Sequence, residues 1–277
     1  MGAWRRERVP GRREPDIQGR SDHERDRPGP DCVDPAARGG RVRHCHGDLH
    51  LGNVAIIDGE PIPFDCLEFD AELATTDVLY DLAFLVMDLW ARGLRHEANV
   101  VANTYFDHAT FDGSIDDEEA FRLLPVLLAV RATVRAHVAA AEHDVERAHE
   151  YLALALGFTD FSLPQLVAIG GGSGTGKSTI ARAVGGSLDP APGARILRTD
   201  VLRKRLAGVG IADRLPRSAY TDAARAAVYT ELFRLAEADL RGGMSVIADA
   251  VFGRRSQSSA IADAAERAGV DFTGIWL

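Results

Sequence analysis

The segment Gly171–Ser178 constrains the fold of this chain more than any other, because it reads Gly-Gly-Ser-Gly-Thr-Gly-Lys-Ser. This order fits the phosphate-loop pattern G-x-x-x-x-G-K-[ST] at every fixed position. The apolar residues Leu166–Ile169 before it favour a short buried strand, and residues 179–184 after it favour the start of a helix. Glycines between a strand and a helix let backbone N–H groups and the positive helix end converge on one phosphate. The alternative is a glycine-rich turn without a ligand.

Lysine usage supports phosphate binding. Lys177 and Lys204 are the only lysines in a chain with 32 Lys and Arg residues. A compact ammonium at Lys177 suits the β- and γ-phosphates of a nucleotide, and the hydroxyl of Ser178 suits Mg²⁺. We therefore predict ATP and Mg²⁺ as cofactors. The residues expected to contact the nucleotide are Gly171, Gly172, Ser173, Gly174, Thr175, Gly176, Lys177, Ser178 and Thr179.

Length, charge and cysteine content limit the possible functions. A chain of 277 residues is expected to form two domains. Its net charge of −9 makes non-specific nucleic-acid binding unlikely. Its 3 cysteines, without a recognisable signal peptide, predict a reducing, cytoplasmic location. We expect no apolar run close to the roughly 20 residues that a membrane helix needs, and therefore no membrane association.

Residues 1–40 differ in composition from the rest of the chain. They contain mixed-charge runs broken by proline and glycine, such as Asp22–Pro30, and few large apolar residues. Such a segment buries too little apolar surface to offset chain entropy, so we predict disorder. A basic tail for nucleic acid is the weaker alternative, because acidic residues are interleaved. A start outside the natural reading frame would give the same composition.

A second polar segment, His46–Asn53, is dense in chemically active side chains. Residues 54–64 after it predict a β-hairpin, with an Asp-Gly turn between two apolar runs. The return strand brings Asp65 back beside Asp48 and Asn53. A kinase catalytic loop uses this arrangement: one aspartate accepts the proton of the substrate hydroxyl, while an asparagine and a second aspartate hold the metal ions.

These residues resemble a known family. The segments His46–Asn53, Phe64–Asp65 and Asp77–Ala83 look like motifs of the aminoglycoside phosphotransferase family of kinase-like folds. The resemblance covers roughly residues 41–157. The chain departs from the family before the catalytic loop, where residues 1–40 do not read as the glycine-rich nucleotide lobe and contain no lysine.

The resemblance implies roles for four residues. Asp48 would be the catalytic base, and Asn53 and Asp65 would be Mg²⁺ ligands. Asp81 would brace the catalytic loop. Because the nucleotide lobe is replaced, we expect that this half does not work as a kinase by itself.

A zinc site is a competing interpretation of the same segment. His44, His46, Asp48 and His50 form H-x-H-x-D-x-H, close to a motif of zinc hydrolases. The spacing is one residue too long, and no later histidine pair completes a ligand set. His44 and Cys45 read equally well as strand residues that lead into the loop.

Helices are expected between the catalytic loop and the phosphate loop. Apolar periodicity and a glycine stop indicate the first of them, and Pro125 is expected to kink or divide the third. The expected helices are Asp77–Gly93, Arg95–His108, Asp116–Glu142 and Val145–Leu156, followed by a linker over residues 158–164.

The last hundred residues alternate between strand and helix patterns, which predicts a parallel sheet. Polar residues follow two of the strands, where side chains face the ligand crevice. Asp200 is the expected contact or base for a substrate hydroxyl, and Asp249 the expected acidic group near Mg²⁺. Both also read as plain helix N-caps. The expected strands are Leu166–Ile169, Arg195–Thr199, Ser245–Ala248 and Phe272–Leu277.

Four basic residues near the same edge are weaker candidates. Arg203 and Lys204 would meet phosphate or would be ordinary helix charges. Arg254 and Arg255 lie at the next helix start.

Residues 165–277 resemble P-loop small-molecule kinases of the gluconate-kinase and polynucleotide-kinase type, a group often described as AAA-family ATPases. The fusion of the two halves looks like a class of bifunctional bacterial proteins. By that resemblance the lid helices and a further strand should follow Trp276, so both ends of the chain are expected to be cut.

Taken together, the sequence predicts an α/β chain with two parts. Residues 41–157 are a mostly helical kinase-like C-lobe, and residues 165–277 an incomplete P-loop domain with a parallel sheet. We predict an ATP-binding kinase that acts on a small hydroxylated compound. The alternatives are an ATP-dependent regulatory switch and an inactive gene fragment.

Overall fold

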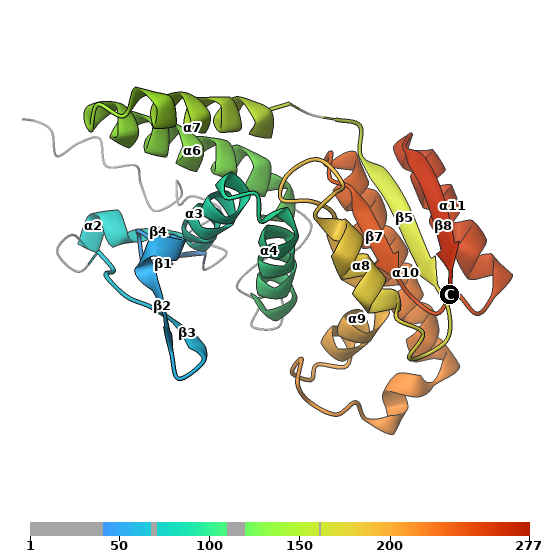
Figure 1. Ribbon diagram of the computed structural model, residues 1–277. Coiled ribbons are helices and arrows are strands. Elements are labelled where there is room, and N and C mark those ends of the chain that lie inside the picture. Colours follow the sequence, from blue (N-terminus) through green and yellow to red (C-terminus); the bar gives the residue numbers. More distant parts are fainter. Residues whose placement is uncertain (1–40, 68–70, 110–119, 161) are drawn as a thin grey trace, which may run out of the picture. The chain divides into compact units, whose positions relative to one another are not determined.

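The computed structural model describes residues 41–67, 71–109, 120–160 and 162–277 (Figure 1). These residues all belong to one compact unit, Pro35–Leu277. The predicted disorder of residues 1–40 and the expected helix start at Asp116 lie outside the described residues.

Two small antiparallel strand pairs frame the polar loop of residues 46–53. Strand β1 (Val42–His44) pairs with β4 (Thr75–Asp77), and β2 (Val54–Ile57) pairs with β3 (Glu60–Pro63). The second pair is the predicted hairpin. Asp58 and Gly59 at its turn have φ values of 53° and 85°, the left-handed conformations that a tight hairpin turn requires.

Helices pack behind these strands around an apolar core. Asp77 caps α3, because its carboxylate accepts a hydrogen bond from the N–H of Leu79. Helices α6 and α7 lie side by side (Figure 1). The fully buried core side chains include Leu79, Phe106, Phe121, Leu124 and Leu128. The helices are α2 (Ala71–Ala74), α3 (Val78–Ala91), α4 (Arg95–Ala109), α6 (Leu124–Ala141) and α7 (Val145–Phe158), with 3₁₀ turns η2 (Leu51–Asn53) and η3 (Phe121–Leu123).

The third expected helix is divided next to Pro125, one of the two outcomes that the sequence predicted. Ala120 is helical, the turn η3 follows, and α6 begins at Leu124, so Pro125 lies in its first turn. Proline fits there because the first helical N–H groups have no partner within the helix. The stretch Phe121–Ala141 has 21 residues and is long and apolar enough to cross a membrane by length and composition alone. The expectation that no apolar run approaches that length is therefore wrong. The core helix of a soluble protein passes the same test, and α6 packs against α3 and α7.

The last part of the chain is a parallel sheet between helices. The strand order is β6-β7-β5-β8, and each neighbouring pair is parallel. Alternate residues of β5 face opposite sides: Leu166 packs in the core with α10 and α11, whereas Val167 packs in the core with α8. This confirms the predicted parallel sheet, with strand ends shifted by at most one residue. The elements are β5 (Gln165–Gly170), α8 (Lys177–Gly185), β6 (Arg195–Arg198), α9 (Thr199–Leu206), η4 (Arg217–Tyr220), α10 (Asp222–Arg241), β7 (Val246–Asp249), α11 (Arg255–Ala268) and β8 (Asp271–Trp276).

Helix α4 joins the helical half to the edge strand β6 through buried amides. The side-chain oxygen of Asn103 accepts from the N–H of Ile196 at 2.8 Å, and its nitrogen donates to the carbonyl of Ala194 at 3.0 Å. Asn99, one turn earlier, donates to the carbonyls of Ala194 at 2.9 Å and Pro192 at 3.1 Å. The polar edge of β6 is thereby satisfied by side chains instead of another strand.

A buried arginine completes this junction. Arg195 is 3% exposed, and its Nη1 donates to Asp107 at 2.9 Å and to Asn103 at 3.0 Å. Gly193 has a φ of 101°, and a Cβ there would lie 2.4 Å from the carbonyl of Gly185, so only glycine fits. We call Asn99, Asn103, Asp107 and Arg195 the α4–β6 seam.

Candidate functional site

The phosphate loop has the backbone that its sequence predicts. It connects β5 to α8, and Gly176 with a φ of 92° occupies the N-cap position of α8. Gly171 has a φ of 142°, and a Cβ there would lie 2.6 Å from the carbonyl oxygen of Leu277. Both positions therefore require glycine, and the loop ends at a helix N-terminus suited to an anion.

The lysine and serine of the loop already have internal partners. Lys177 Nζ donates to the carbonyl of Gly172 at 2.6 Å, so the ammonium lies over the loop. Ser178 Oγ donates to Asp249 Oδ2 at 2.5 Å. Asp249 is 5% exposed and is the last residue of β7, the strand beside β5. The structure thus brings together the two oxygen donors predicted for Mg²⁺, and hydroxyl and carboxylate oxygens suit that ion.

Neither aspartate at the strand ends is a helix N-cap. The N-cap of α9 is Arg198, and Asp200 lies in the first turn of that helix. Asp249 lies inside β7. The N-cap interpretation is therefore wrong for both. The hydroxyl of Thr199 donates to the carbonyl of Asp249 at 3.3 Å, which holds the two strand ends together.

Asp200 is exposed and ion-paired. Its side chain is 57% exposed, and Oδ2 lies 2.9 Å from Arg198 Nη2. Lys204 donates to the carbonyl of Ile211 at 2.6 Å, so this lysine holds the segment after α9. Arg203 lies over the ring of Tyr220, 5.5 Å from its centroid.

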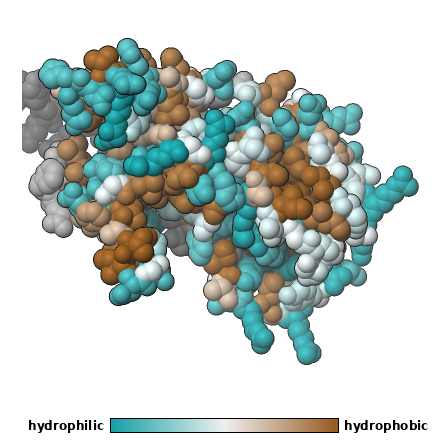
Figure 2. Space-filling view, viewed as in Figure 1, coloured by the Kyte–Doolittle hydropathy of each residue, from teal (hydrophilic) through white to brown (hydrophobic). Residues whose placement is uncertain are grey.

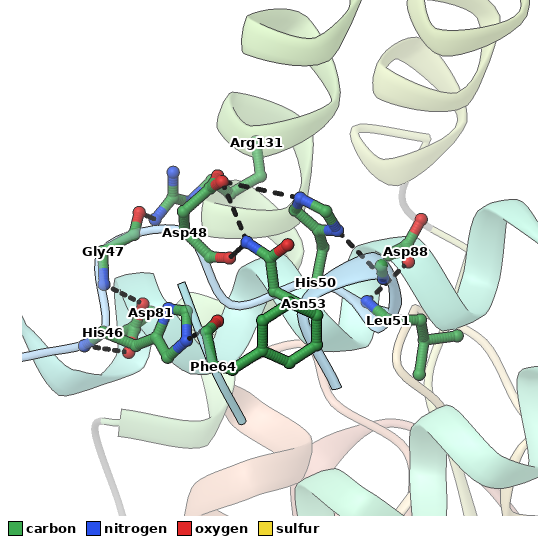
Figure 3. A network of polar contacts seen from close by, with 11 residues as sticks. His46, Gly47, Asp48, His50, Leu51, Asn53, Phe64, Asp81, Asp88 and Arg131 are labelled. Atoms are coloured by element: carbon green, nitrogen blue, oxygen red, sulfur yellow. Dashed lines mark hydrogen bonds and ion pairs between the residues drawn. The ribbon is translucent and has the colours of Figure 1, made fainter. Parts of the chain in front are cut away.

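The polar loop of residues 46–53 is held by side chains of α3 (Figure 3). Asp81 is buried, and its carboxylate accepts from the N–H groups of His46 at 3.0 Å and Gly47 at 2.9 Å. This confirms the bracing role that the resemblance implied. Asp88, two turns further along α3, accepts from the N–H of Leu51 at 3.0 Å. Sequence reasoning missed Asp88, although its spacing of seven residues from Asp81 places both on one helix face.

The side chains of the loop converge on Asp48. Asn53 Nδ2 donates to Asp48 Oδ2 at 3.2 Å, and His50 Nε2 lies 3.5 Å from the same oxygen (Figure 3). Asp48 keeps 41% of its side chain exposed. The N–H of Phe64 donates to the carbonyl of Asn53 at 2.9 Å, so the hairpin returns Asp65 to this region, with a left-handed φ of 61°.

A buried arginine that sequence reasoning did not single out lies beneath the loop. Arg131 of α6 donates to the carbonyls of Tyr80 at 3.1 Å and Gly47 at 3.4 Å. Its guanidinium lies over the rings of Tyr80 and Phe84, 3.7 Å and 4.4 Å from their centroids. Burial lowers the pKa of Arg131 from its usual value. Its partners lie about fifty or more positions away in the sequence, so the neighbouring residues do not predict the role of Arg131.

The zinc interpretation of the same segment is wrong. No group of three His, Cys, Asp or Glu side chains in the described part of the chain is arranged to hold a metal ion, and residues 44–50 are all described. His46 Nε2 instead contacts the carbonyl of Phe64 at 2.9 Å, and His50 Nδ1 accepts from the N–H of Gly52 at 3.0 Å. His44 lies on β1, as the competing interpretation expected.

Residues 166–277 match a protein-family model described as an AAA domain. Two mycobacterial proteins, Uncharacterized protein Rv2004c of Mycobacterium tuberculosis and Uncharacterized protein Mb2027c of Mycobacterium bovis, are each 34% identical to the chain over 218 residues. The match covers 75% of this chain and 42% of each relative, so the chain spans less than half of their length. No solved structure matches significantly. The match and the phosphate loop together assign residues 166–277 to an AAA-type P-loop domain.

Proposed function

We propose that the chain is a cytoplasmic, ATP- and Mg²⁺-dependent kinase that phosphorylates a hydroxyl group of a small molecule. One observation carries this proposal. The phosphate loop places Ser178 against Asp249 at the end of β7, and Asp200 follows the neighbouring strand β6. A phosphate-binding backbone, a pair of oxygen donors and the exposed carboxylate of Asp200, ion-paired with Arg198, meet at one edge of the sheet, where ligands of α/β folds bind.

The residues at this edge divide the work of phosphoryl transfer. The amides of the loop and Lys177 bind the phosphates and neutralise their charge, and Ser178 and Asp249 hold Mg²⁺, which spreads the charge of the transferring group. Asp200 orients the acceptor hydroxyl and takes its proton. The acceptor oxygen then bonds to the γ-phosphorus while the bond to the bridging β-γ oxygen breaks, and ADP leaves.

The helical half is proposed as an aminoglycoside-phosphotransferase-like lobe. Asp48 is its base, and Asn53 and Asp65 are its Mg²⁺ ligands. The bracing of the loop by Asp81 and the contact between Asn53 and Asp48 support this proposal. No lysine precedes Lys177 in the 277 residues, so a phosphate-pairing lysine is offered only by the P-loop. We therefore expect one ATP site, at Lys177.

Replacement of Lys177 by alanine tests nucleotide binding. We expect Lys177→Ala to weaken ATP·Mg²⁺ binding at least tenfold, because the phosphates lose a charge-assisted partner. Calorimetric titration measures both affinity and stoichiometry. Lys204→Ala is the matched control, since it removes the other lysine, which binds the carbonyl of Ile211. Equal affinity of wild type and Lys177→Ala, or a second ATP site that survives in Lys177→Ala, would refute the assignment.

Product analysis separates a kinase from a switch. Wild type and Asp200→Asn are incubated with γ-labelled ATP and polyols, nucleosides or aminoglycosides. A kinase yields a labelled acceptor, and Asp200→Asn abolishes most of that product while ATP affinity is kept. Release of inorganic phosphate alone would instead favour an ATP-dependent switch.

A further inference from the structure

Helix α6 is apolar on the side that faces away from the core. The stretch Phe121–Ala141 is long and apolar, yet only 33% of its most apolar window is buried. Every residue of α6 is described, and its exposed residues are valine, alanine, threonine and histidine, because Arg131 is buried and Arg135 is half-buried. The solvent face of a surface helix normally carries charged residues. The exposed side of α6 therefore has the character of a covered surface. Its most prominent stripe is Val126, Val130, Val134 and Val138, spaced four residues apart.

Helix α7 continues this apolar surface. Its exposed apolar residues recur at steps of four, three and four, which keeps them on one side of the helix, and the same steps run along α6 through residues 126, 130, 133, 137 and 140. Glu146 and Glu150 point about 120° and 160° away from Leu152 around the helix axis, so these charges lie off the surface. The stripe on α7 consists of Val145, His149, Leu152 and Leu156.

A groove joins the two stripes. It has a volume of about 340 Å³ and lies between α6 and α7. Small residues in the groove leave room for the side chains of another helix, as in the packing of ridges into grooves. We call the two stripes and the groove between them the α6–α7 face. The groove lining includes Ala136, Ala140 and Ala148 and the histidines His137, His143 and His149.

The α6–α7 face is large enough for a stable interface. The 18 residues of α6 rise about 27 Å, and two helices side by side are about 20 Å wide, so the flat area is roughly 540 Å². Side chains that project from the helices make the accessible area larger, and a standard protein–protein interface buries about 800 Å² per partner. From Leu123 to Leu156, 8 large apolar side chains are 38–65% exposed in the single chain. An apolar patch of this extent marks an interaction site.

A second copy of the chain fits this face. Two neighbouring helices with an apolar side are half of a four-helix bundle, and another α6–α7 pair completes it. In a two-fold dimer both partners use the same face, and the steps of three and four residues on both helices suit the knobs-into-holes packing of such bundles.

Other occupants fit the face less well. Helix α6 is held in the protein by Arg131 on its opposite side, which donates to the carbonyls of Tyr80 and Gly47. Its 18 residues, all of them described, also expose no Lys or Arg, the residues that helices lying on an anionic membrane carry. Residues 1–40 contain few large apolar residues with which to cover the face.

We propose that the α6–α7 face binds the same face of a second copy, which gives a two-fold dimer with a four-helix bundle at its centre. His137 and His149 lie within the stripes, and polar residues at such positions fix the alignment of the helices. The proposal is independent of the proposed kinase function, because the face contains none of the residues assigned to phosphoryl transfer.

Sedimentation equilibrium of the full chain over a wide range of concentrations tests the dimer. We expect twice the mass of one chain. Val130→Glu and Leu152→Glu, one on each helix, should weaken association about a hundredfold or more, because each places two charges in an apolar interface. Val134→Lys is a further variant on α6. The matched control is Leu206→Glu, which should leave the dimer intact, because Leu206 is similarly exposed, at 50%, at the end of α9.

The variants are expected to fold, because the substituted side chains are exposed in the single chain, and circular dichroism and Tm check this. A monomer at all concentrations would overturn the proposal. So would a dimer that the face variants leave intact, since it would use another surface. A monomer that dimerises only after deletion of residues 1–40 would show that this segment covers the face. A monomer that co-sediments with phosphatidylcholine–phosphatidylserine vesicles, and fails to do so as Val130→Glu, would show that the face binds lipid instead.

Discussion

The α4–β6 seam is expected to contribute strongly to stability, and Asn103→Ala tests this. Asn103 is 6% exposed, and its oxygen is the acceptor for the N–H of Ile196 and for Arg195. Alanine removes that acceptor. Ala194 keeps its bond from Asn99, and Arg195 keeps its bond to Asp107, so the main loss falls on Ile196.

The expected cost follows from these bonds. A buried N–H without a partner costs about 1–3 kcal/mol, and a weakened hydrogen bond from a charged donor adds about 1 kcal/mol. The free energy of unfolding should therefore fall by roughly 2–4 kcal/mol. At about 2–4 °C per kcal/mol for a protein near this size, Tm should fall by roughly 5–15 °C.

Urea and thermal unfolding measure the effect, followed by circular dichroism and by the fluorescence of Trp90, which is 8% exposed in the helical core. Thr104→Ala is the control, because Thr104 is the next residue on α4 and is exposed. A change in Asn103→Ala no larger than in Thr104→Ala would show that the seam is not a stabilising contact and would refute the accounting above.

Three further outcomes are expected. Asp81→Ala should lower the free energy of unfolding by roughly 2 kcal/mol, measured by urea unfolding, because two partly buried N–H groups lose their acceptor. Burial and the charge of Asp81 raise the pKa of the Cys45 thiol, so less thiolate is present at a given pH. The reaction of Cys45 with a disulfide reagent should therefore become faster only above the pH range of an ordinary thiol. Reaction rates measured against pH in a Cys32→Ala, Cys66→Ala background check this. Deletion of residues 1–40 should leave Tm nearly unchanged, and a fall of many degrees would contradict the expected disorder.

The features that sequence reasoning found are those with local signatures. The glycines and lysine of the phosphate loop, the Asp-Gly hairpin turn and the strand periodicity depend on neighbours within a few residues. Asp81 was found through the family resemblance. The structure gives these elements the predicted form.

The features that sequence reasoning missed depend on partners far along the chain. Asn103 reads as an ordinary helix residue, and only the fold brings it to Ile196, which is 93 positions away. Arg131 likewise meets Gly47 across 84 positions. The sequence left open whether Pro125 kinks or divides the helix, because a proline at a helix start and one in its interior differ only in where the preceding turn begins.

The same contacts bear on the choice between a kinase and a switch. A switch needs an element with two arrangements of similar free energy. The α4–β6 seam does not supply one, because sliding α4 would leave the N–H of Ile196 and the guanidinium of Arg195 buried without their acceptors. Adjustable contacts lie instead across the sheet, where Asp222 holds Arg225 and Arg254 through long, exposed ion pairs. The seam therefore keeps β6 and the start of α9, where Asp200 lies, in place. A candidate base on a fixed element suits the proposed kinase better than a switch. Apolar atoms are exposed on the surface of the other half of the chain (Figure 2), and the hairpin residues Ile56 and Ile62, which are 70% and 43% exposed, are not part of these contacts.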